Sequence, residues 1–203
     1  MAVADLDGDG GPEIVTPPPR LTMSAPRIFK WGGQGWQETK MVLGGTTAPR
    51  LGYGGVAVGD MNGDGKADLA TIGHIAGVSV LLNEGFPNFS VETRGLPASM
   101  SGRAIAVGDL DGDGRLDILA QADEPPKVAD ETGSKAVAAE PEREVRAFLA
   151  KKDGSYEEIL GGPELPCFGY AVVLTAAPAD GREPFFYDSC RYGGGTHVLY
   201  TFD

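Results

Sequence analysis

The 203-residue chain contains no apolar run that approaches the roughly 18 to 20 residues of a membrane-spanning helix. Basic residues are also few, since 17 Lys and Arg stand against 29 Asp and Glu and the formal net charge is −12. Binding to a phosphate backbone requires clustered basic side chains, which this sequence lacks. We therefore expect no membrane insertion and no nucleic-acid partner. The start of the chain shows no basic segment followed by an apolar stretch, so we expect no signal peptide within it.

Histidine and cysteine are scarce, with two of each. His74 and His197 fall in no recognisable pairing with a nucleophile, so we predict that the chain is not an enzyme. Cys167 and Cys190 form either a disulfide in an oxidising compartment or two small buried thiols, and the sequence leaves both interpretations open.

Glycine and aspartate, in contrast, recur in a fixed pattern. Three nine-residue loops, at residues 5–13, 60–68 and 109–117, carry an oxygen-bearing side chain at positions 1, 3, 5 and 9 and a glycine at position 6. The loops begin about 50 residues apart, a period that is typical of propellers and other repeat arrays. These three loops are the frame on which the other predictions rest.

The oxygen-rich loops suit a hard divalent cation. Ca²⁺ takes six to eight oxygen ligands, and Asp at alternate positions of a tight loop directs short carboxylates inward. A backbone carbonyl at position 7, from Gly11, Lys66 or Arg115, can add another oxygen. The loops contain no Cys or His, which argues against zinc and copper, and Mg²⁺ prefers a small octahedron with retained water.

An EF-hand shares the first half of this spacing but closes with a bidentate Glu at position 12. Position 12 is occupied here by Thr16, Thr71 and Ala120. The acid stands at position 9 instead, and strand-like segments flank the loop on both sides. We therefore exclude a calmodulin-like helical switch.

Each loop separates two short apolar segments, and two further strand-like segments follow in every repeat. The predicted strands cover residues 2–4, 14–15, 27–31 and from 36 onward; 55–59, 69–72, 78–82 and from 89 onward; and 104–108, 118–120, 145–149 and from 156 onward. Four strands per repeat is the pattern of a propeller blade. We predict an all-β fold, a β-propeller of about four four-stranded antiparallel blades.

We expect a single domain, residues 1–203, divided into blade 1 at 1–43, blade 2 at 51–96, blade 3 at 102–160 and a degenerate blade 4 at 165–203. In blade 4, the segment 176–184 aligns with the loop but keeps only Asp180 among the ligand positions, so we predict no ion there. Blade 4 also lacks a fourth strand. The propeller is therefore closed with four blades, a fragment of a larger propeller, or completed by a dimer.

A proline- and acid-rich insert at residues 123–144 interrupts blade 3. Its composition predicts a mobile surface excursion. We interpret it either as a partner-binding loop or as a tolerated insertion.

The segment Ala-Val-Gly-Asp-Leu-Asp-Gly-Asp-Gly-Arg-Leu-Asp-Ile-Leu at residues 106–119 resembles the FG-GAP or VCBS repeat of integrin α-subunit propellers and of many bacterial secreted and surface proteins. The resemblance covers residues 1 to about 160. It implies three Ca²⁺ sites with the side-chain ligands Asp5, Asp7, Asp9 and Glu13; Asp60, Asn62, Asp64 and Asp68; and Asp109, Asp111, Asp113 and Asp117.

We therefore expect a calcium-stabilised, non-catalytic binding or adhesion module of a secreted or cell-surface protein, with the periplasm as an alternative compartment. Its ligand would be a protein or a glycan, and open propeller edges would allow a homodimer. Two alternatives are a lectin-like propeller and an accessory repeat domain of a secreted hydrolase or lyase. A lectin would use exposed aromatics as sugar platforms, namely Trp31, Trp36, Tyr53 or Tyr192. Otherwise the aromatics that open the fourth strands pack between blades.

Overall fold

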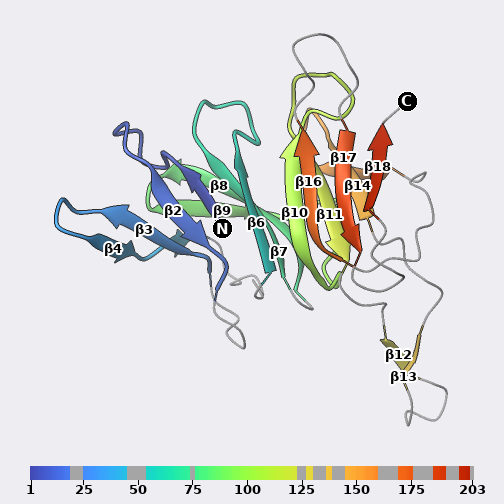
Figure 1. The fold of residues 1–203 in the computed structure, drawn as a ribbon. Coiled ribbons are helices and arrows are strands. Elements are labelled where there is room, and N and C mark those ends of the chain that lie inside the picture. Colours follow the sequence, from blue (N-terminus) through green and yellow to red (C-terminus); the bar gives the residue numbers. More distant parts are fainter. Residues whose placement is uncertain are drawn as a thin grey trace.

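The computed structural model describes residues 1–18, 25–44, 54–73, 76–122, 127–129, 136–138, 145–159, 169–175, 185–190 and 197–201. Within these ranges every regular element is a β-strand (Figure 1). The same ranges hold no helix of the length and hydropathy that a membrane crossing needs. The predicted all-β fold is confirmed for the described part of the chain.

The first sheet contains four antiparallel strands in chain order, β1 (Ala2–Ala4), β2 (Glu13–Thr16), β3 (Arg27–Trp31) and β4 (Trp36–Thr39). The third sheet repeats this order with β10 (Gly102–Gly108), β11 (Asp117–Ala122), β14 (Val145–Ala150) and β15 (Tyr156–Ile159). The strands fall where the apolar segments predicted them. A turn with its own backbone hydrogen bonds joins the last two strands in each case, as Gly32 N–H donates to the carbonyl of Gly35 and Lys151 N–H to that of Ser155.

The second sheet has the same four antiparallel strands and one addition. Its strands are β6 (Gly54–Gly59), β7 (Asp68–Gly73), β8 (Gly77–Gly85) and β9 (Asn88–Glu92), and β5 (Val42–Leu43) pairs in parallel with β9. The predicted boundary of blade 1 at residue 43 therefore includes two residues that hydrogen-bond to the second sheet. Their backbone groups find partners at its outer edge, where Val42 N–H donates to Pro87 and Gly44 N–H to Phe89.

The fourth sheet has three strands among the described residues, β16 (Gly169–Thr175), β17 (Phe185–Cys190) and β18 (His197–Thr201). All three strands lie within residues 165–203, the range of the predicted degenerate repeat. A separate hairpin of β12 (Lys127–Ala129) and β13 (Ala136–Ala138) lies inside the insert and was not predicted. Its two Val-containing segments are too short to stand out in a segment rich in Pro and Glu.

The four sheets stand side by side in a row. Figure 1 shows the first sheet and β16–β18 at opposite ends, and β1 contacts β6, β6 contacts β10, and β10 contacts β16. Because the side chains of a strand alternate between the two faces of its sheet, the second and third sheets each pack against a neighbouring sheet on both faces. In β7, Leu69 faces the first sheet while Ala70 and Ile72 face the third, and all six residues of the strand are buried.

Three apolar cores hold the row together. The first core, between the first and second sheets, contains Leu6, Val15, Ile28, Val56, Leu69, Leu81 and Phe89. The second core, between the second and third sheets, includes Met61, Ala70, Ile72, Val80, Ile105, Ile118, Phe148 and Tyr156. The third core contains Ala104, Leu110, Leu119 and Ala147, on the face of the third sheet where β10 and β11 contact β16.

The connection between the second and third sheets contains a close backbone approach. Gly95 has φ 79°, a Cβ on it would stand 1.7 Å from the carbonyl oxygen of Tyr156, and Tyr156 N–H donates to the carbonyl of Arg94. We predict that Gly95→Ala lowers the free energy of unfolding by about 3 kcal/mol or more, because strain and a backbone clash add. Gly33→Ala shares the positive φ with open space around it, and it should cost about 1 kcal/mol. Equal costs in urea denaturation would contradict the prediction.

Candidate metal centres

Each predicted loop connects the first two strands of a sheet, and its first Asp organises the turn. Asp109 accepts hydrogen bonds from Gly112 N–H at 2.8 Å and from Gly114 N–H at 2.9 Å, one on each carboxylate oxygen. Both glycines have positive φ, 78° and 85°, which an L side chain rarely adopts. Asp5 and Asp60 make the equivalent pairs of bonds at 2.7 to 2.8 Å. The three loops therefore share one conformation, set by one carboxylate and two glycines.

The acid at position 9 is buried in all three loops. One oxygen of Asp117 accepts from Leu110 N–H at 2.7 Å, and the other accepts from Ala150 N–H at 2.8 Å. Asp117 thereby joins the start of its loop to the third strand of the sheet. Asp68 does the same with Met61 N–H at 2.8 Å and Asn83 N–H at 2.7 Å. In the first loop, Glu13 accepts from Leu6 N–H at 2.8 Å.

Burial raises the pKa of both Asp68 and Asp117. The backbone N–H donors lower it in part, while neighbouring loop carboxylates, such as Asp109 and Asp111 around Asp117, raise it again. The site therefore disfavours the ionised acid on two counts, desolvation and repulsion. A divalent cation in the loop would relieve the repulsion and favour the ionised acid.

Carboxylate oxygens converge at two of the loops. In the first, one oxygen each from Asp5, Asp7 and Glu13 lie within 4.8 Å of one another, and in the third the same holds for Asp109, Asp111 and Asp117. These are positions 1, 3 and 9 of the predicted ligand set. An all-oxygen cluster fits a hard cation such as Ca²⁺, so the donor chemistry of these residues agrees with the expected ion.

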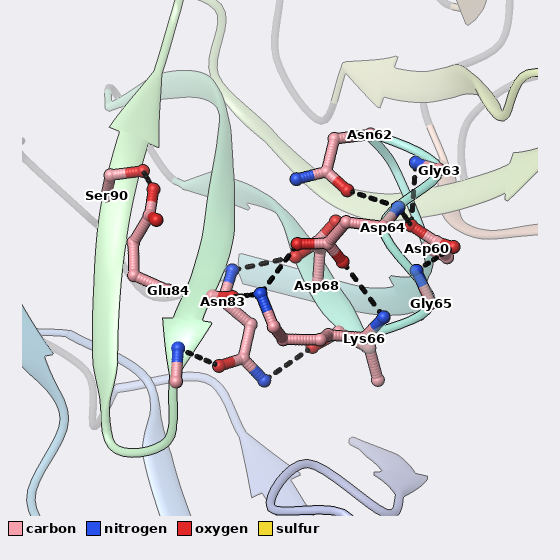
Figure 2. Close-up of polar contacts among 12 residues, drawn as sticks. Asp60, Asn62, Gly63, Asp64, Gly65, Lys66, Asp68, Asn83, Glu84 and Ser90 are labelled. Carbon is pink, nitrogen blue, oxygen red and sulfur yellow. Dashed lines mark hydrogen bonds and ion pairs between the residues drawn. The ribbon is translucent and has the colours of Figure 1, made fainter.

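The second loop has Asn62 at position 3, and Figure 2 shows how its residues lie. Asp60 accepts from Gly63 and Gly65, and Asn62 Oδ1 accepts from Asp64 N–H at 3.0 Å. The amide oxygen therefore stands where the other loops carry a carboxylate. The set remains all-oxygen but has one fewer negative charge.

The acid at position 5 pairs with a basic side chain in all three loops, and its role as an ion ligand stays a prediction. Asp9 and Asp113 stand outside the two oxygen clusters. Asp113 pairs with Arg115, Asp64 pairs with Lys66 at 2.7 Å, and Asp9 pairs with Lys30 of β3 at 2.7 Å. These contacts lower the pKa of Asp9, through the hydrogen bond from Lys30, and of Asp64, through that from Lys66.

Lys30 reaches further than the other two basic side chains. Besides Asp9 it donates to Asp7, and its Nζ lies 3.7 Å from Glu13 Oε1. The first loop thus holds a cation from its own chain against three of its acids. At position 7, the N–H groups of Gly11, Lys66 and Arg115 donate to the position 5 acids, and the role of their carbonyls as ligands stays a prediction.

Two kinds of residue at these centres were not singled out from the sequence. Asn83, buried at the end of β8, donates from Nδ2 to the carbonyl of Leu6 at 2.8 Å and so links the second sheet to the first loop. The position 2 residues are buried and apolar, and they are Leu6 in the first core, Met61 in the second and Leu110 in the third. The apolar residue that recurs between positions 1 and 3 of every loop was the sequence signal that could have identified these core residues.

Several predicted residues lie outside the described ones. They include Tyr53, His74, Cys167 and Tyr192, and also residues 176–184, which align with the loop in the fourth repeat. The choice between a disulfide and two buried thiols stays open, and the absence of an ion in the fourth repeat stays a prediction.

The acids at positions 9 and 3 should differ in what their removal costs. Asp117→Ala leaves the buried N–H groups of Leu110 and Ala150 without their acceptor, so it should destabilise the fold by about 2 to 5 kcal/mol even in chelator. Asp111→Ala removes an exposed side chain that accepts one loop hydrogen bond, and in chelator it should cost about 1 kcal/mol or less. Chemical denaturation measures both, and an equal loss in chelator would contradict the structural role of position 9.

The model of the FG-GAP-like repeat family matches residues 5–71 and residues 60–120, which together span more than half of the chain. Each match begins at the first Asp of a loop and ends in the second strand of the following sheet. The matched unit therefore runs from one candidate metal centre through the next. A comparison with curated proteins found no match. The repeated loops, the strands that flank them and the family match agree, and the chain belongs to the FG-GAP-like repeat family.

Proposed function

We propose that this chain is a calcium-stabilised, non-catalytic binding module of a secreted or cell-surface protein. The observation that carries the proposal is the convergence of three carboxylates within 4.8 Å in the first and third loops, each group including a buried acid. Like charges brought together in this way repel one another unless a cation joins them, and in the first loop Lys30 already contacts two of these acids, Asp7 and Glu13. The family supports the setting, because FG-GAP-like repeats typically occur in extracellular or surface proteins.

We also propose that the four sheets are blades of a β-propeller. The first strands β1, β6, β10 and β16 neighbour one another along the row, and the loops recur at the same place in each of the first three sheets. Loops, faces and strand order all repeat with the sequence period, as blades do. Open inter-strand loops would then present the binding surface to a protein or a glycan.

Among the candidate ions, calcium fits the ligands of these loops best. The ligand positions offer oxygen alone, and extracellular modules bind Ca²⁺ with dissociation constants of about 10⁻⁴ to 10⁻³ M. An ion that binds only the folded loop stabilises the fold by about 2.7 kcal/mol at a free concentration of 100 times its dissociation constant. The effect would reach the cores, because position 2 of each loop is anchored in one.

A non-catalytic role agrees with how the acids are used. The position 9 acids accept backbone hydrogen bonds, and the position 5 acids pair with Lys30, Lys66 and Arg115. Repeats of this family are typically binding or structural units. Attack on a substrate would need a free, activated group, and these carboxylates have structural partners.

Calcium titration tests the proposal. We predict three Ca²⁺ ions per chain by isothermal titration calorimetry, and a rise in melting temperature of about 5 °C or more on going from chelator to saturating Ca²⁺. Asp111→Ala should lose one ion and part of the rise. Glu157→Gln is the matched control, because it removes one exposed carboxylate outside the loops and should keep both. Unchanged melting of the wild-type chain in chelator and in calcium would refute the proposal.

A further inference from the structure

The residue that stands across from the position 9 acid, on the third strand, differs between the sheets. Continuing each strand register by one residue pairs these two positions directly. The pairs are Glu13 with Lys30 in the first sheet, Asp68 with Leu82 in the second and Asp117 with Leu149 in the third. Both leucines pack against apolar cores. The first sheet therefore carries a positive charge where the other two carry an apolar side chain.

Lys30 directs its ammonium to the carboxylates of the first loop. Its Nζ donates to Asp7, donates to Asp9 at 2.7 Å and lies 3.7 Å from Glu13 Oε1. Asp7 and Glu13 belong to the group of oxygens that converge within 4.8 Å. Their side chains are 18% and 1% exposed, so water screens their charges less than those of a surface pair. The ammonium thus acts on acids that are expected to ligate Ca²⁺.

The basic side chains at the other two loops are placed differently. Lys66 pairs with Asp64 at 2.7 Å (Figure 2), and Arg115 pairs with Asp113. Each also donates to a backbone carbonyl at the end of the third strand of its sheet, at 3.2 Å for Lys66 and 3.0 Å for Arg115. Among the described residues, neither forms an ion pair with an acid at position 1, 3 or 9. Lys30 is therefore distinct in contacting positions 3 and 9 of its loop.

We propose that Lys30 is a built-in counter-ion of the first loop, which stabilises the loop in the absence of Ca²⁺ and competes with Ca²⁺ for Asp7 and Glu13. The inference rests on the proposed function, because it concerns the affinity of one of the proposed calcium sites. A divalent cation and an ammonium repel one another at contact distance, so Lys30 must leave these two acids when the ion binds. The first site therefore binds Ca²⁺ more weakly than it would with leucine at residue 30.

Asp9 offers the displaced ammonium a partner. Lys30 has a flexible four-carbon stem, and its side chain is 33% exposed. Asp9 is 52% exposed and stands outside the oxygen cluster, so it can keep the ammonium while Asp7 and Glu13 take up the ion. Lys66 and Arg115 already have this arrangement with their own position 5 acids. Calcium binding at the first loop is thus an exchange of cations, whereas at the other two loops the basic side chain stays in place.

Lys30→Gln and Lys66→Gln are matched variants that each remove one positive charge beside a loop. The amides of Gly10, Gly65 and Gly114 donate to the position 1 acids, so their NMR signals report the three sites separately during a Ca²⁺ titration. In Lys30→Gln, the half-saturating Ca²⁺ concentration at Gly10 should fall about tenfold or more and stay within about twofold at the other two glycines. In Lys66→Gln it should be unchanged at Gly10 and change less than about fivefold at Gly65.

Melting in chelator tests the counter-ion role without any bound ion. Lys30→Gln should lower the melting temperature by about 3 °C more than Lys66→Gln does, because it leaves the acids of the first loop without their cation. Lys30→Leu reproduces the residue type of the other two sheets, and it should show the same gain in Ca²⁺ affinity at Gly10. Its agreement with Lys30→Gln would show that the gain comes from the lost ammonium and not from the new side chain.

The possible failures differ in what they overturn. A wild-type chain in which no loop glycine responds to Ca²⁺ would refute the proposed function and the competition together. A wild-type response at all three glycines, with the same half-saturating concentration at Gly10 in both Lys30 variants, would overturn the competition and leave the proposed function standing. Equal melting of Lys30→Gln and Lys66→Gln in chelator would overturn the counter-ion role.

Discussion

The buried acid at the end of each loop is the interaction on which the structure depends. In the second and third sheets, a single carboxylate accepts N–H groups from the loop and from the third strand, so Asp68 and Asp117 each fix three strands relative to one another. Burial makes the ionised acid costly, and the two N–H donors offset that cost only in part. A cation in the loop would supply the remaining stabilisation.

The same loops link the candidate ion sites to the apolar cores. Position 1 and the two glycines shape the turn, and the apolar residue at position 2 enters a core that lies on the side of the following sheet. The conformation of each loop is therefore coupled to the packing of the sheets, because a loop that opens withdraws its position 2 residue, Leu6, Met61 or Leu110, from its core. Asn83 extends the coupling, because it bonds the loop of one sheet from the strand of the next. The repeated unit thus includes both a loop and the interface beyond it.

Local, periodic features of the fold could be predicted from the sequence. The loops, the strands beside them and the all-β class follow from residue spacing, as does the cluster at positions 1, 3 and 9 of two loops. Features that depend on distant partners could not be predicted. The short strand β5 forms by pairing with β9, and Asn83 finds its acceptor at Leu6, which is distant in the sequence. Lys30 pairs with Asp7 and Asp9 only because the fold brings β3 to the first loop. Sequence spacing also did not distinguish the aromatics that open the fourth strands, of which two are buried and one is half exposed, namely Phe89, Tyr156 and Trp36.

Hydrogen exchange at the amides that meet the buried acids tests the central claim most directly. The N–H groups of Leu110 and Ala150 both donate to Asp117, so they should be protected in chelator and exchange more slowly still when calcium is added. The Glu157 amide, on the edge strand β15, should respond less to calcium. Rapid exchange of Leu110 and Ala150 in both conditions, at the rate of exposed amides, would contradict the account.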